Sequence, residues 1–170
     1  IPGFARPAHR KLRQKLREIQ AWAETSPLNL RRDGDPELGI VTPGISYQHV
    51  REASPQASVL KLGTVHPLPV GLVRSFAQGV ERCLVVEEGD PFFADAIRAA
   101  GVPVESKGEA FRFGELNVER VRRIVARDES PEPPPAKAKP PELCEACPYH
   151  PVYGALRRMD CIVAGDIGCY

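Results

Sequence analysis

Short apolar runs alternate with helical patterns through the central part of the chain. Residues 38–42, 59–62 and 83–86 are mainly apolar stretches of strand length, and residues 102–104 form a shorter fourth stretch. Apolar runs of this kind are typical of parallel strands that are covered on both faces. The pattern therefore predicts almost complete burial for five strand residues, namely Val41, Leu60, Leu62, Val85 and Val86.

Helices are predicted between these strands and after the last of them. Residues 46–53 and 70–78 have helical patterns, and Gly79 supplies the stop for the second. Residues 117–126 form a further helix, whose inward face holds Val118, Val121 and Val125. Strand and helix patterns that alternate with short connections indicate a parallel sheet with right-handed crossovers. We therefore expect one α/β domain between residues 37 and 127.

The helix that follows residues 83–86 has its own start and stop signals. Asp90 is predicted as its N-cap, and Pro91 lies in its first turn. Gly101 supplies a left-handed exit at its other end. The predicted inward face consists of Phe92, Ala96, Ile97 and Ala100.

A basic amphipathic helix is predicted at residues 6–24. Its apolar stripe consists of Ala8, Leu12, Leu16, Ile19 and Ala23, and its other faces hold Arg6, Arg10, Lys11, Arg13, Lys15 and Arg17. Such a helix can contact RNA or a membrane, but the stripe also suits packing against a neighbouring domain, and we favour packing. The pair Ser26-Pro27 ends the helix, because the residue before a proline is disfavoured in the α conformation.

A proline-rich stretch separates the α/β domain from a further set of patterns. Residues 130–141 contain six prolines and no large apolar side chain, so we expect a semi-rigid spacer. Beyond it, Pro151 opens a predicted helix whose buried stripe is Val152, Ala155, Leu156 and Met159. Residues 161–164 are predicted as a strand, and residues 165–168 as the turn that follows it.

Composition and charge narrow the range of partners. The 23 Lys and Arg residues balance 22 Asp and Glu, and the net charge of +1 points to neither nucleic acid nor a membrane. No apolar run approaches the roughly 20 residues that span a bilayer, and no signal peptide opens the chain. Cysteines are odd in number, and Cys83 and Cys161 lie in apolar runs. We therefore expect no disulfide framework and a reducing, cytoplasmic location.

The carboxyl ends of the predicted strands hold polar residues of types that serve acid–base chemistry. Ligands of open α/β sheets gather at this edge. It places His66 after the second strand and Glu87, Glu88 and Asp90 after the third. No nucleophile or glycine-rich phosphate loop accompanies them. We interpret His66, Glu87 and Glu88 as loop and subunit-contact residues, and His49 as a surface histidine.

Three cysteines near the end of the chain suggest a metal or redox centre. Cys144 and Cys147 form a C-x2-C pair, and Cys169 follows in a glycine-rich turn. Zinc and iron–sulfur clusters both normally use four ligands, so a fourth ligand would lie beyond Tyr170. A thioredoxin-like redox pair and ordinary cysteines without a shared ligand are the other interpretations. Because the chain begins with Ile1 and ends within this pattern, we expect an internal piece of a longer protein.

Several runs together resemble a known family. They are residues 38–47 (LGIVTPGISY), 60–63 (LKLG), 67–69 (PLP), 84–88 (LVVEE), 143–148 (LCEACP) and 165–170 (GDIGCY). The set is similar to the alpha subunit of the indolepyruvate:ferredoxin oxidoreductases, a branch of the thiamine-dependent 2-oxoacid:ferredoxin oxidoreductases. The resemblance runs along nearly the whole chain, and GDIGCY is its most specific part. After the first cysteine the family usually has Pro-Gly-Cys-Pro-His-Arg, whereas this chain has Glu-Ala-Cys-Pro-Tyr-His, which keeps the second thiol.

The resemblance implies a domain plan and a reaction. Residues 1–32 would trail from a preceding domain, residues 33–128 would form a transketolase C-terminal-like α/β domain, and residues 129–142 would be a linker. Residues 143–170 would begin a second α/β domain, which binds thiamine pyrophosphate. The implied reaction is the oxidative decarboxylation of indolepyruvate and other aryl pyruvates, with the acyl group passing to coenzyme A and the electrons to ferredoxin.

The resemblance also implies site residues, cofactors and partners. Cys144, Cys147 and Cys169 would bind a 4Fe-4S cluster. The residues at the site of thiamine pyrophosphate and Mg²⁺ would be Asp166, Ile167, Gly168 and Cys169. The implied partners are ferredoxin, the beta subunit, coenzyme A and an aryl pyruvate, and this piece alone would hold no cofactor and be inactive. The competing hypothesis is a non-catalytic binding or scaffold module with a structural metal clip at Cys144 and Cys147.

Overall fold

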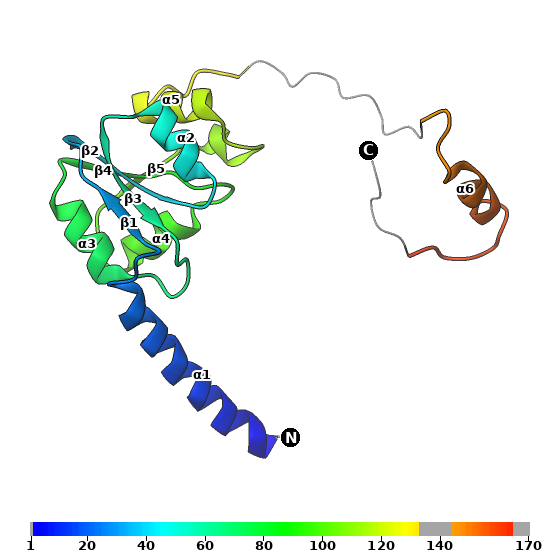
Figure 1. Ribbon diagram of the computed structural model, residues 1–170, viewed down its shortest axis with the longest axis horizontal. Helices are drawn as coiled ribbons and strands as arrows, with labels where there is room; N and C mark the ends of the chain where they lie inside the picture. Colours follow the sequence, from blue (N-terminus) through cyan, green and yellow to red (C-terminus); the bar gives the residue numbers. More distant parts are fainter. Residues whose placement is uncertain (1, 133–143, 165–170) are drawn as a thin grey trace. The chain divides into compact units, whose positions relative to one another are not determined.

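A computed structural model describes residues 2–132 and 144–164 of the chain (Figure 1). The chain separates into two compact units, Ile1–Pro131 and Glu132–Tyr170. The predicted linker at residues 129–142 falls largely outside the described residues, as does the glycine-rich turn at residues 165–168.

The first unit is built on a mixed sheet of five strands. They are β1 Leu30–Arg32, β2 Asp35–Pro43, β3 Ala57–Leu62, β4 Arg82–Val85 and β5 Glu105–Ser106. Their order across the sheet is β1-β3-β2-β4-β5, in which β1 runs antiparallel to β3 and every other pair is parallel. The predicted α/β fold with a parallel sheet is therefore confirmed, and β1 is an addition that the apolar pattern did not indicate.

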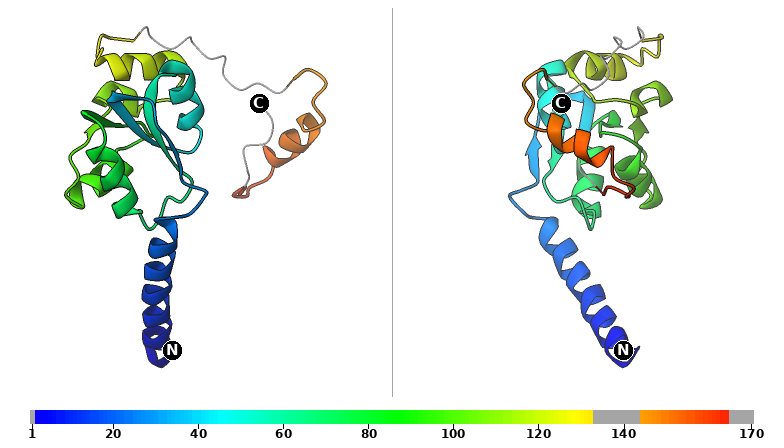
Figure 2. Two further views of the ribbon diagram at one scale, coloured as in Figure 1. Left: turned by 60° about the vertical axis from the view of Figure 1, so that its left-hand side comes forward. Right: turned by 90° about the vertical axis from the view of Figure 1, so that its right-hand side faces the viewer.

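Helices cover both faces of this sheet. The α-helices of the first unit are α1 Pro2–Ala23, α2 Ser46–Ala53, α3 Val70–Gln78, α4 Phe92–Ala99 and α5 Val118–Ala126, and a 3-10 helix spans Glu109–Arg112. Figure 2 shows α2 on one face of the sheet and α3 and α4 on the other. The predicted ranges for α2 and α3 match the structure.

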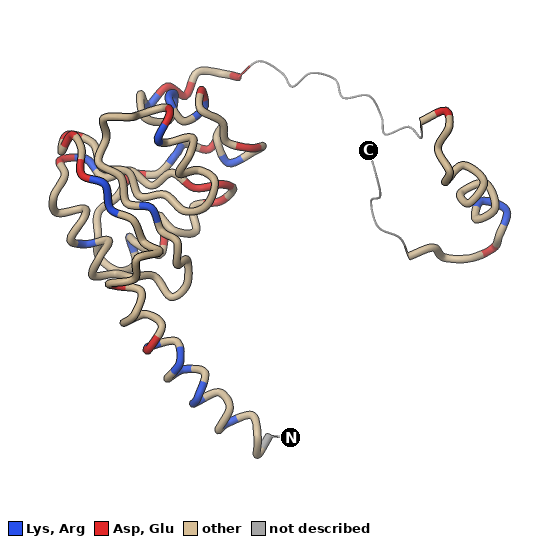
Figure 3. The backbone as a smooth tube through the Cα atoms, viewed as in Figure 1, with Lys and Arg blue, Asp and Glu red and all other residues tan. Residues whose placement is uncertain are grey.

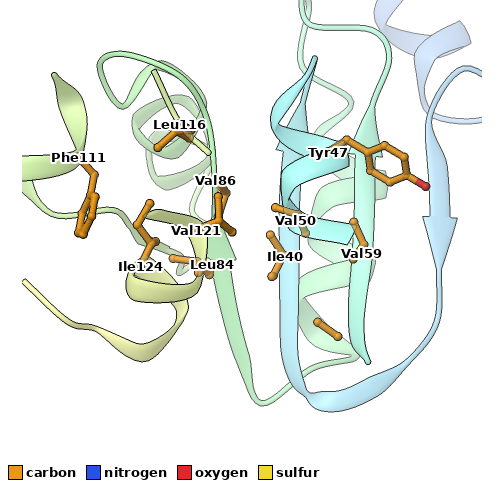
Figure 4. Close-up of a cluster of buried hydrophobic side chains, with 11 residues drawn as sticks. Ile40, Tyr47, Val50, Val59, Leu84, Val86, Phe111, Leu116, Val121 and Ile124 are labelled. Carbon is orange, nitrogen blue, oxygen red and sulfur yellow. The ribbon is translucent and has the colours of Figure 1, made fainter. Parts of the chain in front are cut away.

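The alternation of side chains along the strands produces two apolar layers. In neighbouring strands Val59, Ile40 and Leu84 lie in register and pack towards α2 and α5 (Figure 4). The next row of the register faces α3 and α4 and consists of Leu60, Val41 and Val85. The five strand residues predicted to be buried are each at most 1% exposed. Strands covered on both faces explain why their sequences are nearly continuous in apolar residues.

The helix α4 differs from its prediction in its N-cap residue and in the side of the helix that is buried. The helix begins after Pro91, and Asp90 provides no side-chain cap. Phe92 is 63% exposed, whereas the buried residues of α4 are Phe93, Ala94 and Ile97. The carboxylate of Glu87 accepts the N–H groups of Phe93 and Ala94, and it thereby holds this first turn from the end of β4.

The segment after α4 also differs in part. The predicted strand at residues 102–104 is wrong in position, because the strand that pairs with β4 is Glu105–Ser106, while Val102 is buried without lying in a strand. Gly101 has the predicted left-handed conformation, with a φ of 76°. In α5, Asn117 is the N-cap and its side chain accepts the N–H of Arg120.

The buried face of α5 contains an arginine that the apolar pattern missed. Val121 is buried as predicted, but Val118 and Val125 are only half-buried. The guanidinium of Arg120 is 2.7 Å from the carbonyl oxygen of Glu115, 3.0 Å from that of Ala110 and 2.8 Å from that of Phe113, and it donates to all three. Arg120 therefore holds the loop before α5 to the helix.

The two ends of the chain bury few of their apolar side chains in the described residues. Of the predicted stripe on α1, only Ala23 is buried in the described residues, and Leu12 is 54% exposed. In the second unit, α6 His150–Leu156 buries no residue, so the predicted stripe on this helix is wrong. Residues 161–164 are exposed and lie outside any strand, since no described strand of that unit is available to pair with them. Among the described residues, no helix combines the length and the apolar character needed to cross a bilayer.

Candidate functional site

Glu87 stands at the carboxyl end of β4 and is 4% exposed. Its carboxylate oxygens are 2.8 Å from the backbone nitrogen of Phe93 and 2.9 Å from that of Ala94. Burial raises the pKa of Glu87, and these two hydrogen bonds and the charge of Lys107 act in the opposite direction. Both oxygens of Glu87 thus take part in capping α4, which is a structural role.

Lys107 is the buried cation of the same edge, and no sequence pattern pointed to it. Its Nζ donates to the carbonyl oxygens of Glu87 and Gly89, the latter at 2.6 Å. Burial lowers the pKa of Lys107, and the nearby carboxylates of Glu87 and Glu88 partly offset this effect. Glu88 in turn accepts the N–H of Leu116 at 3.1 Å. These bonds hold the loop at residues 87–89, so the carboxylates stabilise the fold.

The other polar residues of this edge do not join that network. In the part of the chain that the structure describes, neither His66 nor Asp90 forms a side-chain hydrogen bond or an ion pair, and both are exposed. His66 lies in a loop, in agreement with its interpretation as a loop residue, and Asp90 lies in the loop before α4. His49 is half-buried on α2. The carboxyl edge therefore brings the predicted acid–base residues to one side of the sheet without assembling a catalytic group from them.

Cys144 and Cys147 lie at the two ends of one tight turn just before α6. The N–H of Cys147 donates to the carbonyl oxygen of Cys144 at 2.8 Å, and the N–H of His150 donates to that of Cys147 at 3.2 Å. Cys144 is exposed, whereas Cys147 is only 5% exposed. A C-x2-C turn is a backbone arrangement from which two thiolates can reach a single metal. This turn is the part of the described chain that best suits a metal or redox centre.

His150 belongs to the same turn and was missed by the sequence reasoning. Its Nε2 is 3.0 Å from the carbonyl oxygen of Cys144, to which it donates in the tautomer that carries its proton on Nε2. The first residue of α6 thus closes the loop that holds both thiols. The signal for it is the spacing of six residues between Cys144 and His150.

The rest of the predicted site is not part of the described structure. Cys169 lies outside the described residues, and so do the other residues predicted for the cofactor site, Asp166, Ile167 and Gly168. Within residues 2–132 and 144–164, no three His, Cys, Asp or Glu side chains are grouped so that they could hold a metal ion. The described cysteines are free thiols, namely Cys83, Cys144, Cys147 and Cys161. The set of three cysteine ligands therefore stays a prediction.

Comparison with known proteins identifies relatives along the whole chain. No family model matches the chain. The indolepyruvate oxidoreductase subunit IorA of Pyrococcus abyssi is 33% identical over 200 aligned positions that include all of this chain, and that of Methanothermobacter thermautotrophicus is 34% identical over 200. The chain spans 31% of the length of the first relative and 32% of the second.

A solved structure has a similar fold. It is the 2-oxoglutarate:ferredoxin oxidoreductase from Magnetococcus marinus, determined with 2-oxoglutarate, coenzyme A and succinyl-CoA bound. The TM-score is 0.50 and the sequence identity is 18%, over 59% of this chain and 19% of that one. At this identity the likeness concerns the fold, and it agrees with the α/β architecture of the first unit.

Proposed function

We propose a function on the premise that the chain belongs to the family of the IorA subunits of indolepyruvate oxidoreductase. The whole protein oxidatively decarboxylates indolepyruvate and other aryl pyruvates. It transfers the acyl group to coenzyme A and the electrons to ferredoxin, and it works with a beta subunit in the cytoplasm. The observation that carries this proposal is identity of 30–34% to six IorA subunits along the whole of this chain.

The residues of the second unit carry the proposed chemistry. Two thiols in one turn suit the first half of a set of cysteine ligands, because iron–sulfur clusters are held by cysteine thiolates. Cys144, Cys147 and Cys169 would hold a 4Fe-4S cluster. Asp166, Ile167, Gly168 and Cys169 would line the site of thiamine pyrophosphate and Mg²⁺. When bound, thiamine pyrophosphate supplies the nucleophilic carbon for 2-oxoacids and the cluster carries single electrons.

We also assign roles to the described side chains in and beside the turn that holds the two cysteines. His150 keeps the loop between the two cysteines closed through its bond to the Cys144 carbonyl oxygen. Burial of Cys147 excludes water from one of the two sulfur atoms. The α/β domain of the first unit carries no assembled catalytic group among its described residues, so we assign it the role of positioning other parts of the subunit.

The test uses the full-length subunit, prepared without oxygen together with its beta subunit. We expect Cys147→Ser to lower indolepyruvate-dependent ferredoxin reduction by at least about tenfold and to reduce the iron content, because a cluster ligand is lost. The matched control is Cys161→Ser, which removes an exposed thiol outside the C-x2-C pair. It should leave both measurements near the wild-type level.

The same experiment separates the proposal from the scaffold hypothesis. A full-length protein that contains zinc at the C-x2-C pair and reduces no ferredoxin with any aryl pyruvate would support a structural metal clip. If Cys147→Ser kept wild-type electron transfer and iron content, the assignment of Cys147 as a cluster ligand would be wrong. The assignment of the reaction would survive that second result, because it rests on the similarity along the chain.

A further inference from the structure

A hollow of about 280 Å³ lies between the second half of α1 and the loop that leaves β3. It is lined by Arg13, Leu16, Arg17, Gln20, His66 and Pro67. Two guanidinium groups one helical turn apart and an imidazole therefore line the hollow together with a leucine and a proline. The loop follows the carboxyl end of β3, the edge at which open α/β sheets bind their ligands.

The two arginines of this hollow have no carboxylate partner among the residues that the structure describes. In the described part of the chain, neither Arg13 nor Arg17 forms an ion pair, and no Asp or Glu lines the hollow. Glu18, the one carboxylate of α1, lines a different hollow and accepts a hydrogen bond from Gln14. Figure 3 shows the series of basic residues along α1.

The arginines of the α/β domain differ in this respect from those of α1. Most of them pair with a neighbouring carboxylate, for example Arg31 with Asp33 at 2.7 Å and Arg98 with Asp95 at 3.0 Å. In such a pair, at least one hydrogen-bond donor of the guanidinium group is satisfied within the chain. Arg13 and Arg17 keep theirs available for an external anion.

The two walls of the hollow are fixed to each other by hydrogen bonds. The amide of Gln20, one turn after Arg17, donates to the carbonyl oxygen of Leu68 at 3.0 Å. Glu24, just beyond α1, accepts the N–H groups of Gly71 and Leu72 at the start of α3. Both contacts hold the end of α1 against the loop that carries His66. The cationic side chains are thus presented from backbone that is held in place.

We propose that this hollow binds the phosphate group of a small phosphate ester. Two guanidinium groups can each donate two hydrogen bonds to a phosphate, and the N–H of the imidazole adds a third donor group. A phosphate dianion matches this surplus of positive charge better than a carboxylate does. Leu16 and Pro67 would contact the apolar part of the ester next to the phosphate.

The experiment titrates the 170-residue chain with inorganic phosphate, phenyl phosphate and benzoate in a buffer of low ionic strength. Calorimetry measures the affinities, and the assigned ring resonances of His66 locate the site, with those of His9 on α1 as the internal reference. We expect phenyl phosphate to bind most tightly, and the signals of His66 to shift more than those of His9. If inorganic phosphate bound as tightly as phenyl phosphate, the proposal that the ligand is an ester would be wrong. If benzoate bound as tightly as phenyl phosphate, the proposed preference for phosphate would be wrong.

Two double variants distinguish a specific anion site from general electrostatic attraction of anions to a basic helix. Replacing Arg13 and Arg17 by Gln should weaken binding of phenyl phosphate by about tenfold or more, because both bidentate donors are lost. Replacing Lys11 and Lys15 by Gln removes the same charge from the same helix, outside the hollow. This control pair should change the affinity less than about threefold. Equal loss in the two double variants, or binding without a shift of His66, would overturn the proposal.

Discussion

The two units differ in what holds their backbone in place. In the α/β domain, the sheet and four helices bury two apolar layers, and the largest fully buried side chains include Phe76, Phe111 and Leu60. In the described residues of the second unit, Cys147 is the only buried residue, and the hydrogen bonds join residues close in sequence. Long-range packing therefore stabilises the first unit, and short-range backbone bonds shape the described part of the second.

The part of the chain that contributes most to stability is therefore not the part that holds the proposed ligands. Burial of apolar surface is the main favourable term in folding, and among the described residues nearly all of that burial lies in the α/β domain. A helix as short as α6 is marginal without tertiary packing. The cysteines proposed as ligands nevertheless lie beside α6, so the residues with the most promising chemistry belong to the less packed unit.

Replacing Leu62 by Ala should give the largest effect and would test whether burial is the basis of the difference. Leu62 is 1% exposed between the sheet and α3, so we expect the free energy of unfolding to fall by about 2–5 kcal/mol. Chemical denaturation of the 170-residue chain measures it. In the second unit Val152→Ala is the matched change, and since Val152 is 50% exposed it should cost less than about 0.5 kcal/mol. Equal costs would break the comparison.

Replacing Arg120 by Gln tests whether the α/β domain also depends on buried polar bonds. The change removes the donors to the carbonyl oxygens of Ala110, Phe113 and Glu115, so we expect a loss of about 2–3 kcal/mol. Arg122 on the same helix has an exposed ion pair with Glu119, and Arg122→Gln is the control. It should cost about 0–0.5 kcal/mol by the same denaturation measurement. A cost for Arg120→Gln as small as that of the control would contradict the role given to Arg120.

The thiols of the two units should respond differently to alkaline pH. Burial, with a smaller contribution from Glu105, raises the pKa of Cys83 from 9.0 to about 11. The neutral thiol therefore stabilises the fold below pH 9, and that stabilisation of about 2–3 kcal/mol is lost as the pH rises through 11. In Cys83→Ala this part of the pH dependence should be absent from the unfolding curves, whereas exposed Cys161→Ala should keep it. Identical pH profiles for the two variants would show that Cys83 is not buried in solution.

Replacing Asn117 by Ala is the smallest of the four changes. Its side chain accepts the N–H of Arg120 at 2.9 Å and caps α5, so we expect a loss of about 1 kcal/mol. Thermal denaturation would detect this loss as a small decrease in Tm. Asn117→Asp retains an acceptor and serves as the control, with a change near zero. An unchanged Tm in Asn117→Ala would mean that packing alone holds the helix.

The sequence predicted those parts of the fold that depend on local pattern. The apolar runs of β2, β3 and β4 and the ranges of α2 and α3 follow from periodicity and from stops such as Gly79. Features that depend on a side-chain contact between a helix and the loop before it were not predicted. Glu87 caps α4 in place of Asp90, and Arg120 reaches three carbonyl oxygens of the preceding loop. A helix pattern alone does not tell which neighbouring side chain will fill such a position.

Only the spacing of the two cysteines in the candidate site could be predicted from the sequence. The pair Cys144 and Cys147 was recognised from its interval, and the structure places both in one turn. The bond from His150 to the backbone of that turn and the burial of Lys107 depend on three-dimensional contacts. The hollow between α1 and the loop with His66 was not predicted, because it depends on a contact between two segments that are far apart in the sequence.

The bond between Glu24 and the start of α3 has a consequence for hydrogen exchange. Its carboxylate is the acceptor for the amides of Gly71 at 3.0 Å and Leu72 at 2.6 Å, which in a free helix N-terminus would face water. Deuterium uptake at these two amides should therefore be slow while the end of α1 is docked. In Glu24→Ala it should rise at both positions, while the amides of β3 keep their protection. These two amides thus report whether the first helix is attached to the sheet domain.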